Sequence, residues 1–212
     1  MSTAPLQVLS ISAAFMASGG IATLSLFDVP IIQSQPASRS LPSIRWLFSR
    51  GSHIFPTAAL VSSTGFAYLA YESLSEKYIS LSNFLNGTSG YYAAAAVFTF
   101  GIAPFTMLFM GDPNFILIRK NEEKGGTRSQ KSERQTATQL KSRTAKDSID
   151  GKGDVNQFTD LSGPQEKTIE ETDEEEDREV GELLAKFGRL NTVRAVLMSI
   201  GGVLGLLGAL RR

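Results

Sequence analysis

Two polar side chains stand at the start of the last apolar run of this 212-residue sequence, where they could serve chemistry. Asn191 and Arg194 are three residues apart, and the sixteen residues that follow Arg194 carry no charge. Because residues three apart share one face of a helix, the amide and the guanidinium would point the same way. Such a pair could anchor the helix at the headgroups, hold neighbouring helices together, or form part of a polar site.

Four more side chains are candidates for such a site, because polar groups in apolar surroundings are costly unless they find partners. His53 is the only histidine and precedes Pro56, which we expect in the first turn of a helix. Trp46 could be an interfacial belt residue or a stacking surface. Asp28 and Asn114 follow apolar runs, and Asp28 could equally mark a helix end or pair with an arginine.

The composition excludes several kinds of site. The chain has no cysteine, so thiolate nucleophiles, disulfides, zinc ribbons and iron–sulfur clusters are ruled out. One histidine cannot build the site of two histidines and a carboxylate that holds non-haem iron. No phosphate-binding glycine motif occurs. We therefore expect no metal and no cofactor, and haem ligation by His53 is the alternative left open.

The elements that must position these side chains are membrane helices. Residues 6–27, 54–71 and 78–111 carry no charge, and runs this long are typical of membrane spans rather than of soluble folds. The sequence predicts an all-α protein, a four-helix transmembrane bundle. Its helices are expected at roughly Leu6–Ile32, Ile54–Tyr71, Tyr91–Met110 and Asn191–Leu210. Within the last helix, Gly201 and Gly205 have the spacing that lets two helix backbones approach closely.

A long polar insert separates the third and fourth helices. Residues 119–178 are rich in charged and small polar residues and poor in apolar ones, a composition typical of disorder. The chain then divides into residues 1–118 with three spans, the disordered insert 119–178, and residues 179–212. This last part combines an amphipathic lead-in with the fourth span, because apolar residues recur at helical spacing before the uncharged run begins.

The distribution of basic residues predicts an orientation. Arg39, Arg45 and Arg50 precede the second span, and Arg119 and Lys120 follow the third. The positive-inside rule therefore places these two connections in the cytoplasm. The two C-terminal arginines argue for the opposite orientation.

A possible modification site lies in the connection on the other side. Asn86 begins the acceptor sequence Asn-Gly-Thr for N-glycosylation. On the predicted topology it faces a lumen or the exterior, and an unmodified Asn-Gly turn is the alternative. We expect a multi-pass membrane protein, with the endoplasmic reticulum as the default location.

The predicted topology brings the candidate side chains to one side of the membrane. Spans one and three end there, and spans two and four begin there, so the polar groups gather at helix ends. These groups are Asp28, Trp46, His53, Asn114 and Arg194. A small bundle whose polar groups converge at one mouth is typical of a ligand pocket.

Three motifs, in order along the chain, carry a resemblance to a known family. They are W-x(6)-H-x-x-P from Trp46 to Pro56, P-F-T-x(3)-M-x(3)-N from Pro104 to Asn114, and L-N-x-x-R from Leu190 to Arg194. Apart from the insert and the extreme N-terminus, the chain resembles the anthrone oxygenase family. The resemblance implies a small four-span membrane protein of fungal polyketide pathways. Phe187 departs from the family pattern, which often has tryptophan there.

The resemblance implies a cofactor-independent monooxygenase of secondary metabolism that oxidises a polyketide-derived anthrone to the anthraquinone with molecular oxygen. For this reaction we assign His53 as the general base, because its pKa suits the task. Arg194 would stabilise the enolate as a fixed cation, and Asn191 would orient an oxygen. Three further residues would bind the substrate: Trp46 by stacking, Asn114 by orienting an oxygen, and Asp28 by orienting His53 or neutralising Arg194.

The expected partners are therefore the aromatic substrate, molecular oxygen and the lipid bilayer, with no nucleic acid and a possible homo-oligomer. The alternative function is a non-catalytic membrane scaffold that recruits soluble partners through the charged insert. A transporter is less favoured, because four spans without an evident internal repeat make a small pathway.

Overall fold

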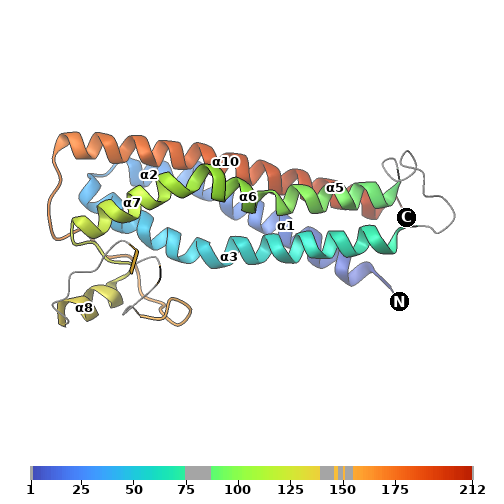
Figure 1. The fold of residues 1–212 in the computed structure, drawn as a ribbon, viewed down its shortest axis with the longest axis horizontal. Coiled ribbons are helices and arrows are strands. Elements are labelled where there is room, and N and C mark those ends of the chain that lie inside the picture. The colour runs from blue at the N-terminus through green and yellow to red at the C-terminus, as the bar shows by residue number, and fades with distance from the viewer. Residues whose placement is uncertain (1, 75–86, 139–145, 148–149, 151–154, 212) are drawn as a thin grey trace. The chain divides into compact units, whose positions relative to one another are not determined.

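The computed structural model describes residues 2–74, 87–138, 146–147, 150 and 155–211. Every regular element in this part of the chain is helical, which confirms the predicted all-α fold (Figure 1). The elements in chain order are α1 (Ala4–Thr23), η1 (Leu24–Asp28), α2 (Val29–Gln33), α3 (Ala37–Glu72), α5 (Thr88–Phe100), α6 (Ile102–Phe105), η2 (Thr106–Met110), α7 (Gly111–Glu123), α8 (Gln130–Thr138) and α10 (Glu174–Leu210). Asn86 lies outside the described residues, so its glycosylation stays a prediction.

The chain forms two compact units, each built from segments that are distant in the sequence. The apolar unit comprises residues 1–23, 54–108 and 191–212, and the polar unit comprises residues 24–53 and 109–190. Helices α3 and α10 contribute residues to both units. The division of the sequence at residues 118 and 178 stays a prediction.

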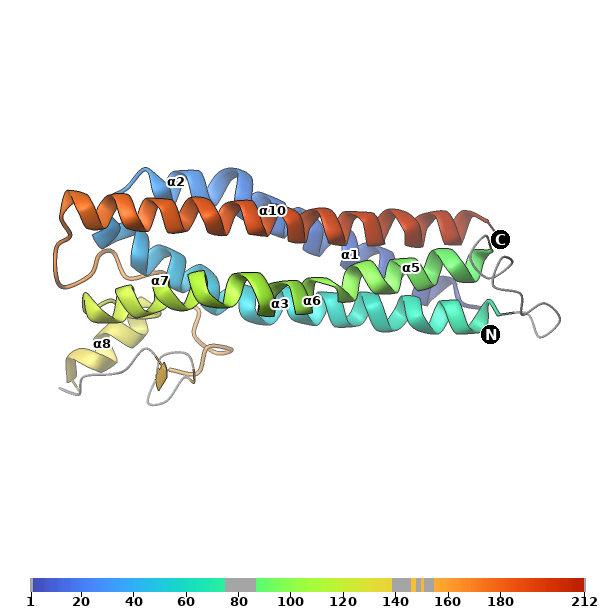
Figure 2. The same cartoon turned by 45° about the horizontal axis from the view of Figure 1, so that its top comes forward.

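Four helical segments pack side by side in the apolar unit, as Figures 1 and 2 show: α1, α5, and the C-terminal parts of α3 and α10. Their small and apolar side chains form one buried core. It includes Ala14, Ala17 and Ile21 of α1, Phe66 and Leu69 of α3, Tyr92 and Ala95 of α5, and Ala195 and Met198 of α10. The many close contacts between these side chains stabilise the packing of the four segments.

Glycines let α10 approach its neighbours closely. A Cβ on Gly201 would lie 2.5 Å from Cγ2 of Thr99 in α5, and a Cβ on Gly205 would lie 2.3 Å from the ring of Phe66 in α3. Real side-chain carbons do not approach so closely, so only glycine fits at these two positions. The prediction that these glycines serve helix packing is confirmed.

Three helical stretches are long and apolar enough to cross a membrane: Ala4–Gln33, Thr88–Glu123 and Glu174–Leu210. They contain the first, third and fourth predicted spans. The second, residues 54–71, is helical as predicted but lies in α3, which is not one of the three. Its hydroxyl side chains, including Ser62, Ser63 and Thr64, make it less apolar. The fourth crossing therefore stays a prediction.

Helix α3 is much longer than the sequence analysis predicted. It begins at Ala37 rather than at Ile54 and runs for 36 residues, so most of the predicted connection is helix. The expectation that Pro56 stands in a first turn is wrong, because Pro56 lies inside α3. Hydropathy marks only the apolar part of a helix, whereas the more polar residues 37–53, which include three arginines, continue this helix in the polar unit.

Two π-helical turns, η1 and η2, interrupt the first and third membrane helices. Pro30 follows η1 and Pro113 follows η2 within three residues. A proline has no N–H to donate to the carbonyl four residues earlier, and that carbonyl lies inside the turn in both cases. A π-helical turn is one local adjustment by which a membrane helix accommodates a proline. The predicted irregularity near Pro104 is also present, since α5 ends at Phe100 and α6 begins after Gly101.

Local signals in the polar unit fix the ends of α7 and α10. Gly125 follows α7 with φ of 72°, and its N–H donates to the Glu122 carbonyl, which ends the helix in the left-handed conformation that glycine favours. At the start of α10, Asp173 accepts from the Glu176 N–H (2.8 Å), and the Glu176 carboxylate accepts from the Asp173 N–H (3.2 Å). This reciprocal pair is a capping box.

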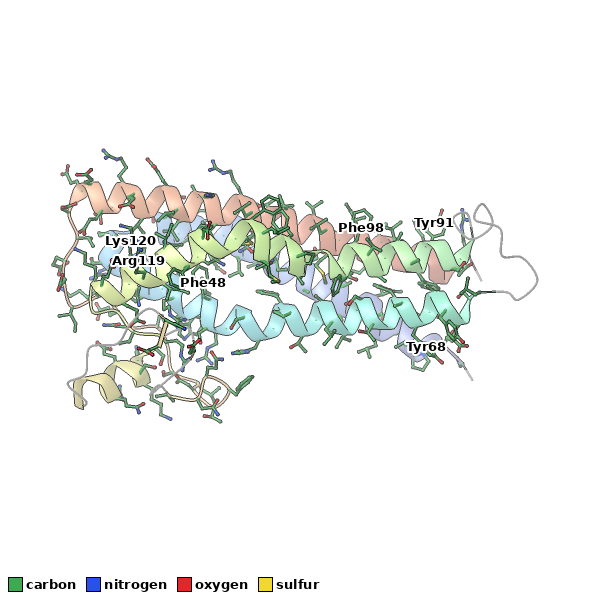
Figure 3. The ribbon with its side chains drawn as sticks, viewed as in Figure 1. Phe48, Tyr68, Tyr91, Phe98, Arg119 and Lys120 are labelled. Atoms are coloured by element: carbon green, nitrogen blue, oxygen red, sulfur yellow. The ribbon has the colours of Figure 1, made fainter. Side chains whose placement is uncertain are left out.

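The described part of the insert is more ordered than its composition predicts. The Thr168 N–H donates to the Ser38 carbonyl of α3 (2.7 Å), and Lys120 of α7, labelled in Figure 3, pairs with Glu179 of α10 (2.7 Å). Lys124 pairs with Glu176 at 2.6 Å. The hydrogen bond from Lys124 is the main cause that lowers the pKa of Glu176 below its ordinary value. Composition counts polar residues but does not reveal that they bond to one another.

Candidate functional site

One face of α3 in the polar unit carries the imidazole and the indole that the sequence singled out. Trp46, Arg50 and His53 are spaced four and three residues apart, which places them along one helix face. Residues 156–162 of the insert lie against this face and are called the covering segment below. The insert therefore contributes to the surroundings of two predicted site residues.

Hydrogen bonds hold the covering segment in place. The Trp46 indole donates to the Ser162 carbonyl at 3.0 Å. The Arg50 guanidinium donates to the same carbonyl at 3.2 Å and to the Gln157 carbonyl at 3.3 Å, and it lies 5.2 Å from the Trp46 ring centre. Trp46 is thus fixed by an acceptor on the segment and by a cation beside its ring. The role of Trp46 in stacking on a substrate stays a prediction.

The His53 ring is covered by an aromatic side chain of the same segment. The ring centres of His53 and Phe158 are 4.4 Å apart, with the planes inclined at 38°. Nε2 of His53 is buried and has no hydrogen-bond partner within the described residues. A buried polar atom without a partner is energetically costly. The nitrogen that a general base would use is therefore shielded from solvent and uncommitted.

Asn114 and Asp28 belong to the same unit but do not bond to His53. Asn114 lies in the first turns of α7, and its Oδ1 is buried without a partner in the described part of the chain. Asp28 is the last residue of η1, and no hydrogen bond or ion pair joins it to His53. The roles of Asp28 and Asn114 in binding a substrate stay predictions.

In the apolar unit, Asn191 and Arg194 share one face of α10, as their spacing predicted, and they also hydrogen-bond to each other. Nη1 of Arg194 donates to Oδ1 of Asn191 at 2.8 Å, and its guanidinium carbon lies 6.0 Å from the Phe55 ring centre. Arg194 is 9% exposed and Asn191 is fully buried. Nε of Arg194 and Nδ2 of Asn191 have no partner among the described residues. Two donors are therefore left over beside a buried positive charge.

The expectation that the candidate residues stand at helix ends is wrong for three of them. Trp46 and His53 lie inside α3, and Arg194 lies inside α10, because both helices continue past the ends of their apolar runs. Asp28, Trp46, His53 and Asn114 fall in the polar unit, and Asn191 and Arg194 in the apolar unit. The convergence of His53 with Arg194 stays a prediction.

Two residues beside Trp46 and His53, Arg50 and Phe158, were not singled out from the sequence. Arg50 lies four residues after Trp46 and three before His53, so helical spacing alone could have placed it beside both. Phe158 had no such signal. It stands in a polar segment more than one hundred positions after His53, and only the fold brings the two rings together.

One buried carboxylate anchors the covering segment. Asp160 is 2% exposed and accepts hydrogen bonds from Ser129 (2.5 Å) and from the Ser162 hydroxyl (2.7 Å). Burial is the largest influence and raises the pKa of Asp160. The hydrogen bonds from Ser129 and Ser162 and the charge of Arg50 lower it, and the pKa ends below the ordinary value of 3.8. The ionised form of Asp160 therefore stabilises the folded segment.

Comparisons with known proteins bear on what this arrangement does. A family model described as anthrone oxygenase matches residues 45–146. The curated protein "Anthrone oxygenase encC" from Aspergillus fumigatus is 29% identical over 216 aligned residues, which cover 97% of this chain and 92% of that protein. No solved structure matches. These findings confirm the resemblance to the anthrone oxygenase family and support the general function of that family.

Proposed function

We propose that this chain, as a relative of the anthrone oxygenases, oxidises an anthrone to the corresponding anthraquinone with molecular oxygen in a cellular membrane. The observation that carries the proposal is a set of unsatisfied polar atoms. His53, Asn114, Asn191 and Arg194 each have one buried nitrogen or oxygen without a partner in the described part of the chain. Buried polar atoms are costly to leave unpaired, so we infer that a ligand with polar groups pairs with atoms of this kind.

The oxidation of an anthrone requires a base and a cation, which an imidazole and a guanidinium can provide. The central methylene of an anthrone is acidic, because loss of its proton gives an enolate conjugated with two aromatic rings. In the proposed mechanism His53 takes up that proton through Nε2, which is buried and free to accept. Arg194 balances the negative charge that develops on the carbonyl oxygen. The apolar surroundings of this cation strengthen the interaction.

The remaining steps balance without a further reactant. The enolate transfers one electron to oxygen, and the resulting radical pair combines to form a carbon–oxygen bond at the former methylene. Protonation gives a hydroperoxide, and loss of the second hydrogen from that carbon breaks the oxygen–oxygen bond. The products are one anthraquinone and one water for each oxygen molecule. Trp46 would stack on the flat substrate, and Asn191 and Asn114 would orient its oxygens.

The direct test uses purified, metal-stripped protein in lipid nanodiscs with anthrone and dissolved oxygen. We expect equal amounts of oxygen consumed and anthraquinone formed, above the rate of empty nanodiscs. With the His53→Ala variant, oxygen consumption should fall to the rate of empty nanodiscs. If the wild-type protein consumes no oxygen with any anthrone, the proposed reaction is wrong.

The scaffold alternative receives less support. A scaffold would present its insert to soluble partners, whereas the described insert residues bond to α3 of their own chain. The proposal also includes a homo-oligomer, the endoplasmic reticulum as location and independence of any cofactor.

A further inference from the structure

The covering segment is tied to α3 on both sides of Phe158. Before it in the chain, the Gln157 carbonyl accepts from Arg50 (3.3 Å), and the Gln157 side chain accepts from the Ser49 hydroxyl (3.4 Å). After it, the Ser162 carbonyl accepts from both Arg50 and Trp46. These bonds place Phe158 on His53 without requiring Phe158 itself to be buried.

A tight turn presents the Phe158 ring. The Phe158 N–H donates to the Asn156 side chain (3.0 Å), and the N–H of Asp160 donates to the Asn156 carbonyl (3.0 Å). The ring remains 72% exposed even though it lies 4.4 Å from the imidazole. Phe158 is therefore held weakly, and little contact is lost when it leaves His53.

The face of His53 that Phe158 occupies is suited to a flat aromatic ring. Two turns earlier on the same helix face stands the Trp46 indole, which donates to Ser162 and lies beside the Arg50 cation. Aromatic rings stack on an imidazole at the 4.4 Å spacing of Phe158 and His53. The position that a substrate would take is thus filled by a ring of the chain itself.

We propose that Phe158 is a built-in occupant of an aromatic binding site on His53, and that a flat polycyclic ligand displaces it to reach Nε2. The identity of the ligand as an anthrone or anthraquinone rests on the proposed function. The displacement itself concerns binding and is independent of turnover. Phe158 is then a residue that sets affinity and selectivity for flat rings, contributed by a part of the insert beyond the residues that the family model matches.

The chain offers two clean reporters for a test. It contains one tryptophan and one histidine, so intrinsic fluorescence reports Trp46 alone and the signal of 13C-labelled histidine reports His53 alone. The full-length protein would carry a tag without histidine and would be measured in nanodiscs. The probe is anthraquinone, which is flat but not oxidised further, and perhydroanthracene serves as a saturated control that does not stack.

We expect Phe158→Ala and Phe158→Leu to bind anthraquinone about two- to tenfold more tightly than wild type, because the competing aromatic contact is removed. Leu161→Ala is the matched control. Leu161 stands on the same segment and is 92% exposed, so its removal should leave the affinity unchanged. Perhydroanthracene should bind all four proteins alike.

The histidine signal distinguishes displacement from other effects. In wild type, anthraquinone should shift the His53 resonance as the Phe158 ring leaves, and both Phe158 variants should show a shifted resonance before any ligand is added. Unchanged or weaker binding in both variants would overturn the proposal, because Phe158 would then be a wall of the site. Oxygen consumption is measured separately, so a chain that binds in this way but does not turn over contradicts the proposed reaction alone.

Discussion

Arg194 is a charged side chain that apolar surroundings tolerate only with partners. Within the described residues, Arg194 hydrogen-bonds to Asn191, one helical turn away on α10 (2.8 Å), and the Phe55 ring centre lies 6.0 Å from its guanidinium carbon. Neither partner carries a negative charge. The guanidinium therefore keeps the capacity to balance an anion, which a simple anchor at the headgroups would not need.

Replacing Arg194 by lysine tests that capacity. Lysine keeps the charge but loses the planar array of donors, so we expect the rate of oxygen consumption with anthrone to fall about a hundredfold. Arg189→Lys is the matched control, because Arg189 is exposed on the same helix. An oxygen electrode measures both. Equal rates for Arg194→Lys and wild type would show that Arg194 serves only as an anchor.

Asp160 makes the covering segment sensitive to acid. Its pKa is lower in the folded protein than the ordinary value, so its ionised form adds stability above pH 3.8 that is lost as the pH falls through the lower folded value. We expect the segment to leave α3 in that acidic range, seen as a change in Trp46 emission when the bond to Ser162 breaks. Asp160→Asn should lack this transition, and its persistence in the variant would assign it to another group.

At the level of elements, the glycines of α10 set how closely the helices of the apolar unit pack. We expect Gly201→Ala to destabilise the protein by about 1–3 kcal/mol. The added Cβ would meet Cγ2 of Thr99 at 2.5 Å and the backbone carbonyl of Ala95 at 3.1 Å, and a backbone atom cannot move aside cheaply. Thermal unfolding in detergent measures the loss.

The matched control for this substitution is Gly19→Ala in α1. Nothing lies within 4 Å of a Cβ built on Gly19, and alanine is the better helix former. Gly19→Ala should therefore be neutral or slightly stabilising. Similar losses for both variants would mean that helix propensity or insertion, not packing at Gly201, governs the result.

The elements show what a sequence can and cannot predict. Uncharged runs located the first, third and fourth membrane helices, because the absence of charge over a span is a property of the local sequence. The early start of α3 at Ala37 was missed, since three arginines and two prolines obscure a helix that no hydropathy rule detects. The shared helix face of Asn191 and Arg194 was predicted correctly from helical geometry, whereas their hydrogen bond was not predicted.

The site was less predictable than the helices. His53 and Trp46 share a face of α3, which their spacing allowed, but the ring that covers His53 comes from an insert whose composition suggested disorder. Phe158 is brought there by backbone carbonyls that accept from Arg50 and Trp46. Bonds to backbone carbonyls leave no mark in the amino-acid sequence, so only the fold could reveal them.

For the whole molecule, the number of membrane crossings depends on α3. Its 36 residues exceed the roughly 20 that a span requires, and its C-terminal part packs among three other helices of the apolar unit through Phe66 and Leu69. Its hydroxyl side chains make it the least apolar of the four. We expect it to cross, because a helix packed within a bundle can turn its hydroxyls toward other helices rather than lipid.

Introduced cysteines can show whether α3 crosses the membrane, because the chain contains no cysteine of its own. Gln35 and Leu74 are exposed and flank the two ends of α3. In sealed membrane vesicles, Gln35→Cys and Leu74→Cys should react with a membrane-impermeant maleimide from opposite sides. Lys131→Cys should match Gln35, and Ser2→Cys should match Leu74. Labelling of both ends of α3 from one side would leave three crossings, and the N-terminus and C-terminus would then lie on opposite sides.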